Sequence, residues 1–398
     1  MIHILDSLYC QCVLLPCHAA CFQPATSAPQ TRVAAHSDAQ SAARPCTGCA
    51  RRPGLEAGDG AARLVVSGRV VAALVDSRQP EVQTEIQPTP LAVLLLGPTA
   101  SGKTALALAL ARHLPVEIVS CDSVAVYRGM EIGSAKPTAA ERALVRHHLL
   151  DVSDPNCDFS AGDYARQARA AMRSIAARGV IPLITGGTGL YLRALTQGLF
   201  FGPQRNAELR ERLGASHARR GAGWLHRLLA RLDSAAAGRI HPNDTPKLIR
   251  ALEVTLAARR PMTQLLAERR EALTGFRLLR IGLNPPRPQL YARINQRAAR
   301  MFAEGLLAET RALVDRFGPV RPLDALGYRQ AMAVLRGTLS EAAAIAAAQQ
   351  GHRNYAKRQM TWFRREPEVH WIADFGDSPT TLETVLGLLA RHGILPSR

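Results

Sequence analysis

Gly97-Pro98-Thr99-Ala100-Ser101-Gly102-Lys103-Thr104 follows an apolar run, 91–96, and precedes a helix-like stretch, 105–112. A buried strand, a glycine-rich turn and a helix in this order are typical of a phosphate-binding loop. Its backbone N–H groups and the positive end of the helix would surround one anion. Lys103 supplies a mobile positive charge, and the Thr104 hydroxyl is placed to bind Mg²⁺. The stretch, here called the cradle (residues 97–104), predicts a phosphate site without specifying the phosphate compound.

The positive charge of the chain is unevenly distributed. The 398 residues carry a formal net charge of +18, but residues 1–88 contain seven arginines, seven acids and no lysine. All the excess therefore lies in residues 89–398. Lysine and arginine contacts to phosphodiesters supply most non-specific affinity for nucleic acid, so the charge favours a polyanionic partner. A generally basic proteome is the alternative explanation.

Residues 1–88 differ in composition from the remainder. They hold six of the eight cysteines, little periodicity and many Ala, Pro, Ser and Gln residues, which favours disorder. Cys46 and Cys49 form a single CxxC without a partner pair at zinc spacing, so a metal site is not expected there. Asp6 and the lack of a basic start argue against export, and there is no apolar run of about 18 residues. We expect a cytoplasmic protein without a membrane span.

After the cradle helix, short apolar runs alternate with helix signals. The runs are 116–120 and 180–184, and between them a capping-box pattern at 159–163 begins a helix that reaches about residue 178. This alternation predicts an α/β fold with a parallel sheet. Asp122 follows the first run. It either faces the same crevice as Lys103, beyond the carboxyl ends of the strands, or caps a helix.

The run 180–184 is followed by Thr185-Gly186-Gly187-Thr188-Gly189. Nucleotide-hydrolysing proteins with such a phosphate loop normally carry an aspartate at this place to hold Mg²⁺. Its absence favours phosphate binding or group transfer over hydrolysis. Asp122 is then the acid best placed to act as a base or to reach the metal.

The second half of the chain is mostly helical. Candidate helices 207–213, 224–232 and 245–260 form a polar, arginine-rich insert, and 276–283 returns to a strand pattern. The expected divisions are 1–88 (extension), 89–202 (first part of the core), 203–275 (helical insert) and 276–398 (second part of the core, with helical C-terminal part).

Two basic helices are expected near the C-terminus, at 287–300 and 341–365. On the second, Arg353, Lys357 and Arg364 fall on one side at about 100° per residue. Ala348, Tyr355 and Trp362 lie roughly opposite. A basic stripe backed by an apolar seam suits RNA phosphates, and a solvated helix face is the alternative.

Taken together, seven stretches carry a family resemblance. They are GPTASGKT (97–104), CDSVAVYRGMEIGSAKP (121–137), ITGGTGLYLRAL (184–195), HPND (241–244), RALEV (250–254), ALGYRQ (325–330) and AKRQMTWFR (356–364). In this order they closely resemble the tRNA dimethylallyltransferases, also called tRNA isopentenyltransferases. The resemblance covers about residues 89–375.

The resemblance implies a P-loop NTPase-like parallel sheet core with an inserted small helical domain over the anticodon stem-loop. It implies transfer of a dimethylallyl group from dimethylallyl pyrophosphate to N6 of the adenine just 3′ of the anticodon. Mg²⁺ is the expected cofactor, pyrophosphate is released, and the enzyme is expected to be a monomer. The cradle would then hold the pyrophosphate of a prenyl donor instead of a nucleotide.

The resemblance also assigns roles residue by residue. Asp122 matches the catalytic aspartate that takes the N6 proton, Lys103 and Arg297 match pyrophosphate contacts, and Thr104 matches the metal contact. The positions matching tRNA contacts are Asp122, Ser123, Val124, Ala125, Thr188, Arg210, Pro246, Lys247, Leu248, Ile249, Arg250, Asp324, Ala325, Leu326, Gly327, Tyr328 and Arg329.

Two of these positions leave questions open. Pro246-Lys247 stands where the family usually has Gln-Arg, so a side-chain amide is lost and a lysine cannot form the bidentate contact of an arginine. Tyr328 could stack on a base or belong to the core.

Two other classes of function share parts of this pattern. A small-molecule P-loop enzyme, either a kinase or an adenylate prenyltransferase, needs the cradle but not the insert or the basic helix. A non-catalytic RNA-binding protein has no use for Asp122 beside a phosphate cradle.

Overall fold

The computed structural model describes residues 89–200, 202–268 and 271–394. The disorder expected for residues 1–88, and the CxxC within them, lie outside these residues. Within the described part of the chain, no helix has the length and apolar character needed to cross a membrane.

A six-stranded sheet forms the centre of the fold, and every pair of neighbouring strands is parallel. All six residues of the cradle strand, β1, are buried, as expected for a parallel strand covered on both faces. Because the strands are parallel, their carboxyl ends share one edge of the sheet. Their order is β3 (His147–His148), β2 (Val116–Cys121), β4 (Ile181–Gly186), β1 (Leu91–Leu96), β5 (Arg277–Leu283) and β6 (Val369–Ile372).

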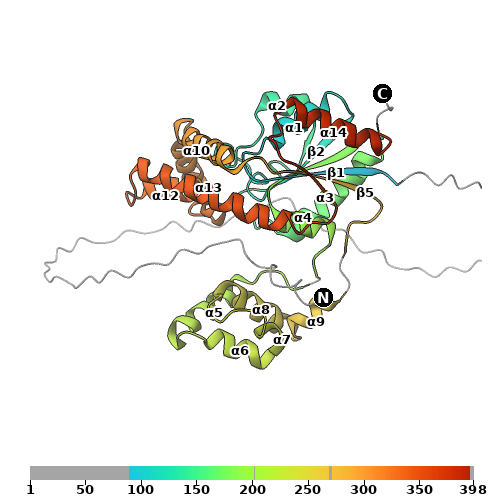
Figure 1. Cartoon of the computed structure of the whole chain (residues 1–398). Helices are drawn as coiled ribbons and strands as arrows, with labels where there is room; N and C mark the ends of the chain where they lie inside the picture. Colours follow the sequence, from blue (N-terminus) through green and yellow to red (C-terminus); the bar gives the residue numbers. More distant parts are fainter. Residues whose placement is uncertain (1–88, 201, 269–270, 395–398) are drawn as a thin grey trace, which may run out of the picture. The chain divides into compact units, whose positions relative to one another are not determined.

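Helices cover both faces of the sheet (Figure 1). On one face, α1 (Lys103–Ala111) and α14 (Pro379–Arg391) pack around a core that includes Leu106 of α1 and Ile281 of β5, both fully buried. On the other face, α3 (Ala161–Ala176) and α4 (Gly189–Thr196) pack around a second core that includes Met172. The expected α/β fold with a parallel sheet is confirmed.

Between α4 and β5 the chain forms five helices among the described residues. They share a core of their own in which Leu225, Leu229 and Leu252 are fully buried. The expected helix 224–232 is observed with the same bounds, whereas the first helix extends beyond the expected residue 213, to Arg220. The divisions at 202/203 and 275/276 stay predictions. The helices are α5 (Ala207–Arg220), α6 (Trp224–Leu232), α7 (Ser234–Ala237), α8 (Thr245–Ala258) and α9 (Met262–Ala267).

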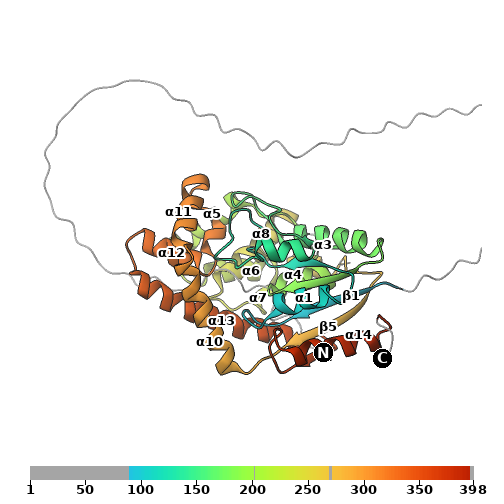
Figure 2. The ribbon, with the colours of Figure 1, turned by 90° about the horizontal axis from the view of Figure 1, so that it is seen from above.

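The helices after β5 pack around a third hydrophobic core. α10 and α12 both pack against the long helix α13, and Figure 2 shows these helices gathered beside the sheet. Their shared core contains Phe302, Tyr328 and Ala348. The helices are α10 (Arg287–Ala303), α11 (Leu306–Phe317), the 3-10 turn η1 (Arg321–Asp324), α12 (Tyr328–Leu335) and α13 (Glu341–Phe363).

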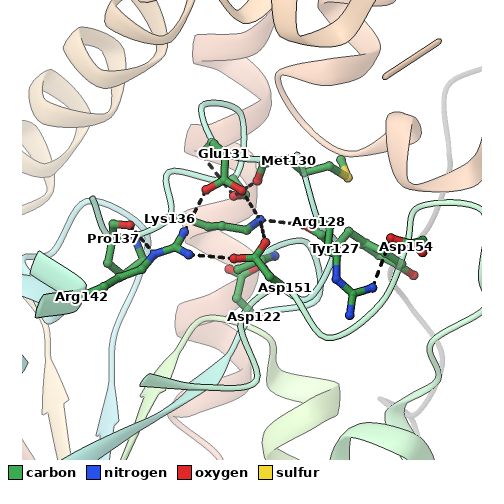
Figure 3. A network of polar contacts seen from close by, with 12 residues as sticks. Asp122, Tyr127, Arg128, Met130, Glu131, Lys136, Pro137, Arg142, Asp151 and Asp154 are labelled. Atoms are coloured by element: carbon green, nitrogen blue, oxygen red, sulfur yellow. Dashed lines mark hydrogen bonds and ion pairs between the residues drawn. The ribbon is translucent and has the colours of Figure 1, made fainter. Parts of the chain in front are cut away.

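A buried lysine stabilises the segment between β2 and the short helix α2 (Ala139–Leu144) (Figure 3). This linking segment begins at Asp122. The side chain of Lys136 is 1% exposed. Its Nζ donates to the Tyr127 carbonyl at 2.6 Å, to Asp151 Oδ1 at 2.6 Å and to Glu131 Oε1 at 2.8 Å. All three protons of the ammonium are thereby satisfied. The lysine holds this segment together and fastens it to the chain that follows β3.

Replacing Lys136 by methionine is expected to lower the free energy of unfolding by about 2 to 3 kcal/mol. The substitution keeps the volume of the side chain but removes charged hydrogen bonds from two carboxylates. Because the Glu131 and Asp151 side chains are 46% and 28% exposed, water moderates the effect. Urea unfolding measures it. The control is Arg128→Met, which breaks an exposed ion pair with Asp154 and should change stability by less than about 1 kcal/mol. Equal losses of unfolding free energy in Lys136→Met and Arg128→Met would contradict the prediction.

Candidate active site

The cradle connects β1 to α1 and contains residues with positive φ angles. Ala100 and Gly102 have positive φ angles of 63° and 88°, and α1 begins at Lys103. A Cβ atom at Gly102 would lie 2.7 Å from the Gly376 nitrogen. Because that contact is with backbone, only glycine fits at residue 102. The expected phosphate-loop geometry is therefore present, with a helix N-terminus directed at the bend.

Lys103 lies folded over the cradle. Its Nζ donates to the carbonyls of Gly97 at 2.9 Å and Pro98 at 2.7 Å. Burial, and then the charge of Arg297, lower the pKa of Lys103 to about 7, while the charge of Asp122 opposes the shift. An anion bound at the cradle would favour the charged ammonium. The side chain is thus placed to act as a charge that responds to a bound phosphate.

Arg297 reaches the cradle from α10. Its Nη1 donates to Thr99 Oγ1 at 3.3 Å. Burial lowers the pKa of Arg297, and the charge of Asp122 partly offsets that effect. Among the described residues, no carboxylate lies within ion-pair distance of this guanidinium. A partly buried cation without a paired anion favours an anionic ligand.

Asp122 follows β2 at the same edge of the sheet as the cradle. Its Oδ1 accepts hydrogen bonds from Val124 N at 2.8 Å and Ala125 N at 3.1 Å. These bonds close a turn, and the residues that follow do not form a helix, so the helix-cap alternative is wrong. Asp122 acts electrostatically on both Lys103 and Arg297. The carboxylate therefore lies near enough to both cations to raise their pKa values, while one of its oxygens fixes its own loop.

The TGGTG stretch lies between Asp122 and the cradle, because β4 separates β2 from β1 in the sheet. Thr188 Oγ1 accepts a hydrogen bond from Ser123 N at 3.1 Å. The Cys121 thiol donates to the Thr188 carbonyl at 3.7 Å. Thr188 is 5% exposed, so in this structure it mainly orders the backbone beside Asp122.

Gln359 is a site residue that the motifs did not single out. Its Oε1 accepts a hydrogen bond from Thr99 N at 2.8 Å, and its Nε2 donates to the Gly187 carbonyl at 2.9 Å. A Cβ atom at Gly187 would lie 2.1 Å from Nε2, so glycine is required for this approach. The available sequence signal was the place of Gln359 inside the stretch 356–364, which carries part of the family resemblance.

In the insert, two predicted tRNA contacts share a buried carboxylate. Glu253 is fully buried, and its Oε2 lies 3.1 Å from Arg210 Nε and 2.7 Å from Arg250 Nη1. Leu248 is also fully buried, whereas Lys247 pairs with Asp244 at 2.6 Å. The two arginines are held in place by a common anion, which orients their remaining donors.

The stretch 324–329 divides into exposed and buried residues. Asp324 and Arg329 are exposed. Tyr328 is fully buried, and its hydroxyl donates to Glu309 Oε1 at 2.6 Å. Of the two alternatives for Tyr328, the structure shows the core position.

The basic stripe on α13 is partly exposed. Lys357 and Arg364 are exposed, but Arg353 donates to Asn295 on α10 and to Gln350. On the opposite side, the Tyr355 hydroxyl donates to the Gly187 carbonyl at 3.2 Å. The side opposite the stripe therefore reaches the site, and two of the three basic side chains are available to an RNA.

The cradle fits a magnesium ion that is held largely by a phosphate ligand. Thr104 is exposed at the start of α1. Within the described ranges, no cluster of three or more His, Cys, Asp or Glu side chains could hold a metal by itself. Mg²⁺ in phosphate sites commonly takes one or two protein ligands, together with substrate oxygens and water. A hydroxyl beside a phosphate loop meets that requirement.

Comparisons with known proteins give one consistent result. The IPP transferase family matches residues 125–366. The tRNA dimethylallyltransferase of Koribacter versatilis is 61% identical over 289 residues, which cover 72% of this chain and 94% of the relative. That of Solibacter usitatus is 50% identical over 301 residues, covering 75% of this chain and 98% of the relative.

Solved structures agree with this match. The tRNA isopentenylpyrophosphate transferase of Bacillus halodurans is 36% identical, with a TM-score of 0.57, and the match covers 76% of this chain and 96% of that one. A eukaryotic dimethylallyltransferase solved acting on tRNA is 21% identical, with a TM-score of 0.64 and coverage of 76% and 79%, and supports the fold alone. By its sequence identity and coverage, the chain belongs to the IPP transferase family of tRNA dimethylallyltransferases.

Proposed function

We propose that this protein transfers a dimethylallyl group from dimethylallyl pyrophosphate to N6 of the adenine just 3′ of the tRNA anticodon. The observation that carries the proposal is that Asp122 follows β2 at the same edge of the sheet as the cradle, where its charge acts on Lys103 and Arg297. A base and two cations around a phosphate cradle suit group transfer from a pyrophosphate ester. Membership of the family favours this reaction over those of a small-molecule kinase or an adenylate prenyltransferase.

The cradle would stabilise the leaving group. Breaking the allylic C–O bond places negative charge on pyrophosphate, and the N–H groups at the start of α1, Lys103 and Arg297 would surround that charge in a donor bound at the cradle. Mg²⁺, when bound beside Thr104, would supply further charge neutralisation. The fixed donors need little reorganisation during the reaction, which is why they lower its barrier.

Asp122 would act on the acceptor. An exocyclic adenine amine is a weak nucleophile, and a carboxylate that takes its proton as the new bond forms assists the attack. Oδ1 is occupied by two backbone N–H groups, so Oδ2 is the oxygen we assign to the proton. The adenine must leave the anticodon stack to reach it. We also propose that the enzyme acts as a monomer. Because its proposed acceptor is a tRNA, we further propose that it acts in the cytoplasm.

The proposal is tested by supplying two acceptors. Protein, Mg²⁺ and dimethylallyl pyrophosphate are incubated with unmodified tRNA or with AMP, and the nucleosides are analysed by mass spectrometry. The expected result is prenylated adenosine in the reaction with tRNA and no prenylated product in the reaction with AMP. A prenyl group on AMP with none on tRNA would establish the small-molecule alternative, and no product with either acceptor would refute prenyl transfer.

The basic stripe predicts a salt-dependent contribution to tRNA binding. Replacing Arg353, Lys357 and Arg364 by alanine should lower the log–log salt slope of tRNA affinity by about 2, because each phosphate contact contributes about 0.9. Arg353 donates a hydrogen bond to Asn295, so its contribution to the salt slope is smaller than that of the other two residues. The affinity for pyrophosphate should stay constant. An unchanged slope would make the stripe a solvated helix face.

A further inference from the structure

A pocket adjoins the cradle between α10 and α13. Its wall is mostly apolar, but three polar side chains reach it, one from the cradle and one from each helix. Because α10 and α13 pack against each other, the two helices hold these side chains in a fixed relation. The pocket is lined by Thr99, Ile294, Arg297, Ala298, Met301 and His352.

His352 is the polar group in this pocket that the proposed reaction has not used. Its Nε2 atom is buried and finds no hydrogen-bond partner among the described residues. A buried polar atom without a partner is unfavourable, because it has lost its hydrogen bonds to water and gained none in return. Such an atom in the wall of a pocket indicates a partner from outside the chain, either a water molecule or an atom of a ligand.

The charges around His352 identify the kind of partner. Burial, followed by the charges of Arg297 and Arg329, lowers the pKa of His352 to about 4. The imidazole is therefore neutral at pH 7 beside two guanidinium groups. An anion in the pocket would be attracted by both arginines, and it would favour an N–H donor on the imidazole.

We propose that His352 donates a hydrogen bond from Nε2 to a diphosphate oxygen of the prenyl donor, as a further contact beside Arg297. The inference rests on the proposed function for the identity of the donor. A diphosphate is favoured over an RNA phosphate because Thr99, a residue of the cradle, lines the same pocket and accepts a hydrogen bond from Arg297. The contact holds the donor and forms no covalent bond.

The affinity for inorganic pyrophosphate, measured by calorimetry without tRNA, tests the proposal. His352→Leu should weaken binding about tenfold, the usual scale for one hydrogen bond to a charged group. His352→Gln retains an N–H donor and should recover part of the loss. His370→Gln is the matched control, because His370 is exposed on β6. Unfolding midpoints confirm that each variant is folded. Equal affinities of the leucine variant and the wild type would overturn the proposal.

Histidine side-chain ¹⁵N NMR provides a direct measurement. Adding pyrophosphate should shift the Nε2 resonance of His352, identified by its loss in His352→Gln, and leave that of His370 in place. A shift produced by an anticodon stem-loop RNA but not by pyrophosphate would assign the contact to RNA and overturn the proposal. Neither measurement needs prenyl transfer, so a protein that binds pyrophosphate but does not prenylate tRNA would refute only the proposed function.

Discussion

Asp122→Ala is expected to lower the rate of prenyl transfer by about 10²-fold or more, the usual scale for losing a general base. The affinity for tRNA should change by only a few-fold. The reason is that Lys103 and Arg297 still hold the donor, whereas the carboxylate that accepts the N6 proton is lost. Single-turnover kinetics with saturating tRNA measure the chemical step separately from binding.

Asp122→Asn is the matched variant for this experiment. An amide oxygen can still accept the hydrogen bonds from Val124 N and Ala125 N that Oδ1 accepts. The loop should therefore keep its structure while the base is lost. A rate close to wild type for the asparagine variant, together with a slow alanine variant, would reduce Asp122 to a structural role. A weakened Mg²⁺ dependence at unchanged turnover would reassign it to the metal.

Arg297→Gln is expected to lower the rate by about 10²- to 10³-fold, as removal of one preorganised donor from a developing anion typically does. The guanidinium lies beside Thr99 of the cradle, and no described carboxylate forms an ion pair with it. Its charge is therefore available to the pyrophosphate. The loss should appear in the rate of the chemical step and in the affinity for pyrophosphate.

Arg300→Gln serves as the control on the same helix. Arg300 is exposed and lies 3.4 Å from Glu304, so its replacement should leave the rate within about twofold. Equal losses in the two variants would mean that only the general basicity of α10 matters. A large loss of tRNA affinity in Arg297→Gln, with pyrophosphate binding retained, would move Arg297 from the donor to the acceptor side.

Features that depend on neighbouring residues could be predicted from the sequence. The cradle is recognisable because its strand, turn and helix are contiguous, and α1 begins at Lys103 within the motif. The amphipathic helix 224–232 has the expected bounds for the same reason. Seven ordered stretches also identified the family, which the comparisons confirm.

Features that depend on packing required the tertiary structure. Gln359 hydrogen-bonds to Thr99 across 260 residues of sequence, and no local pattern specifies which buried polar residue meets which loop. The position of Tyr328 in the core was equally undecided, because an aromatic side chain suits a core and a base stack alike. The sheet order places β4 between β2 and β1. It therefore decides that the TGGTG stretch lies beside both Asp122 and the cradle at one edge of the sheet, since strand neighbours are selected by long-range packing and hydrogen bonding.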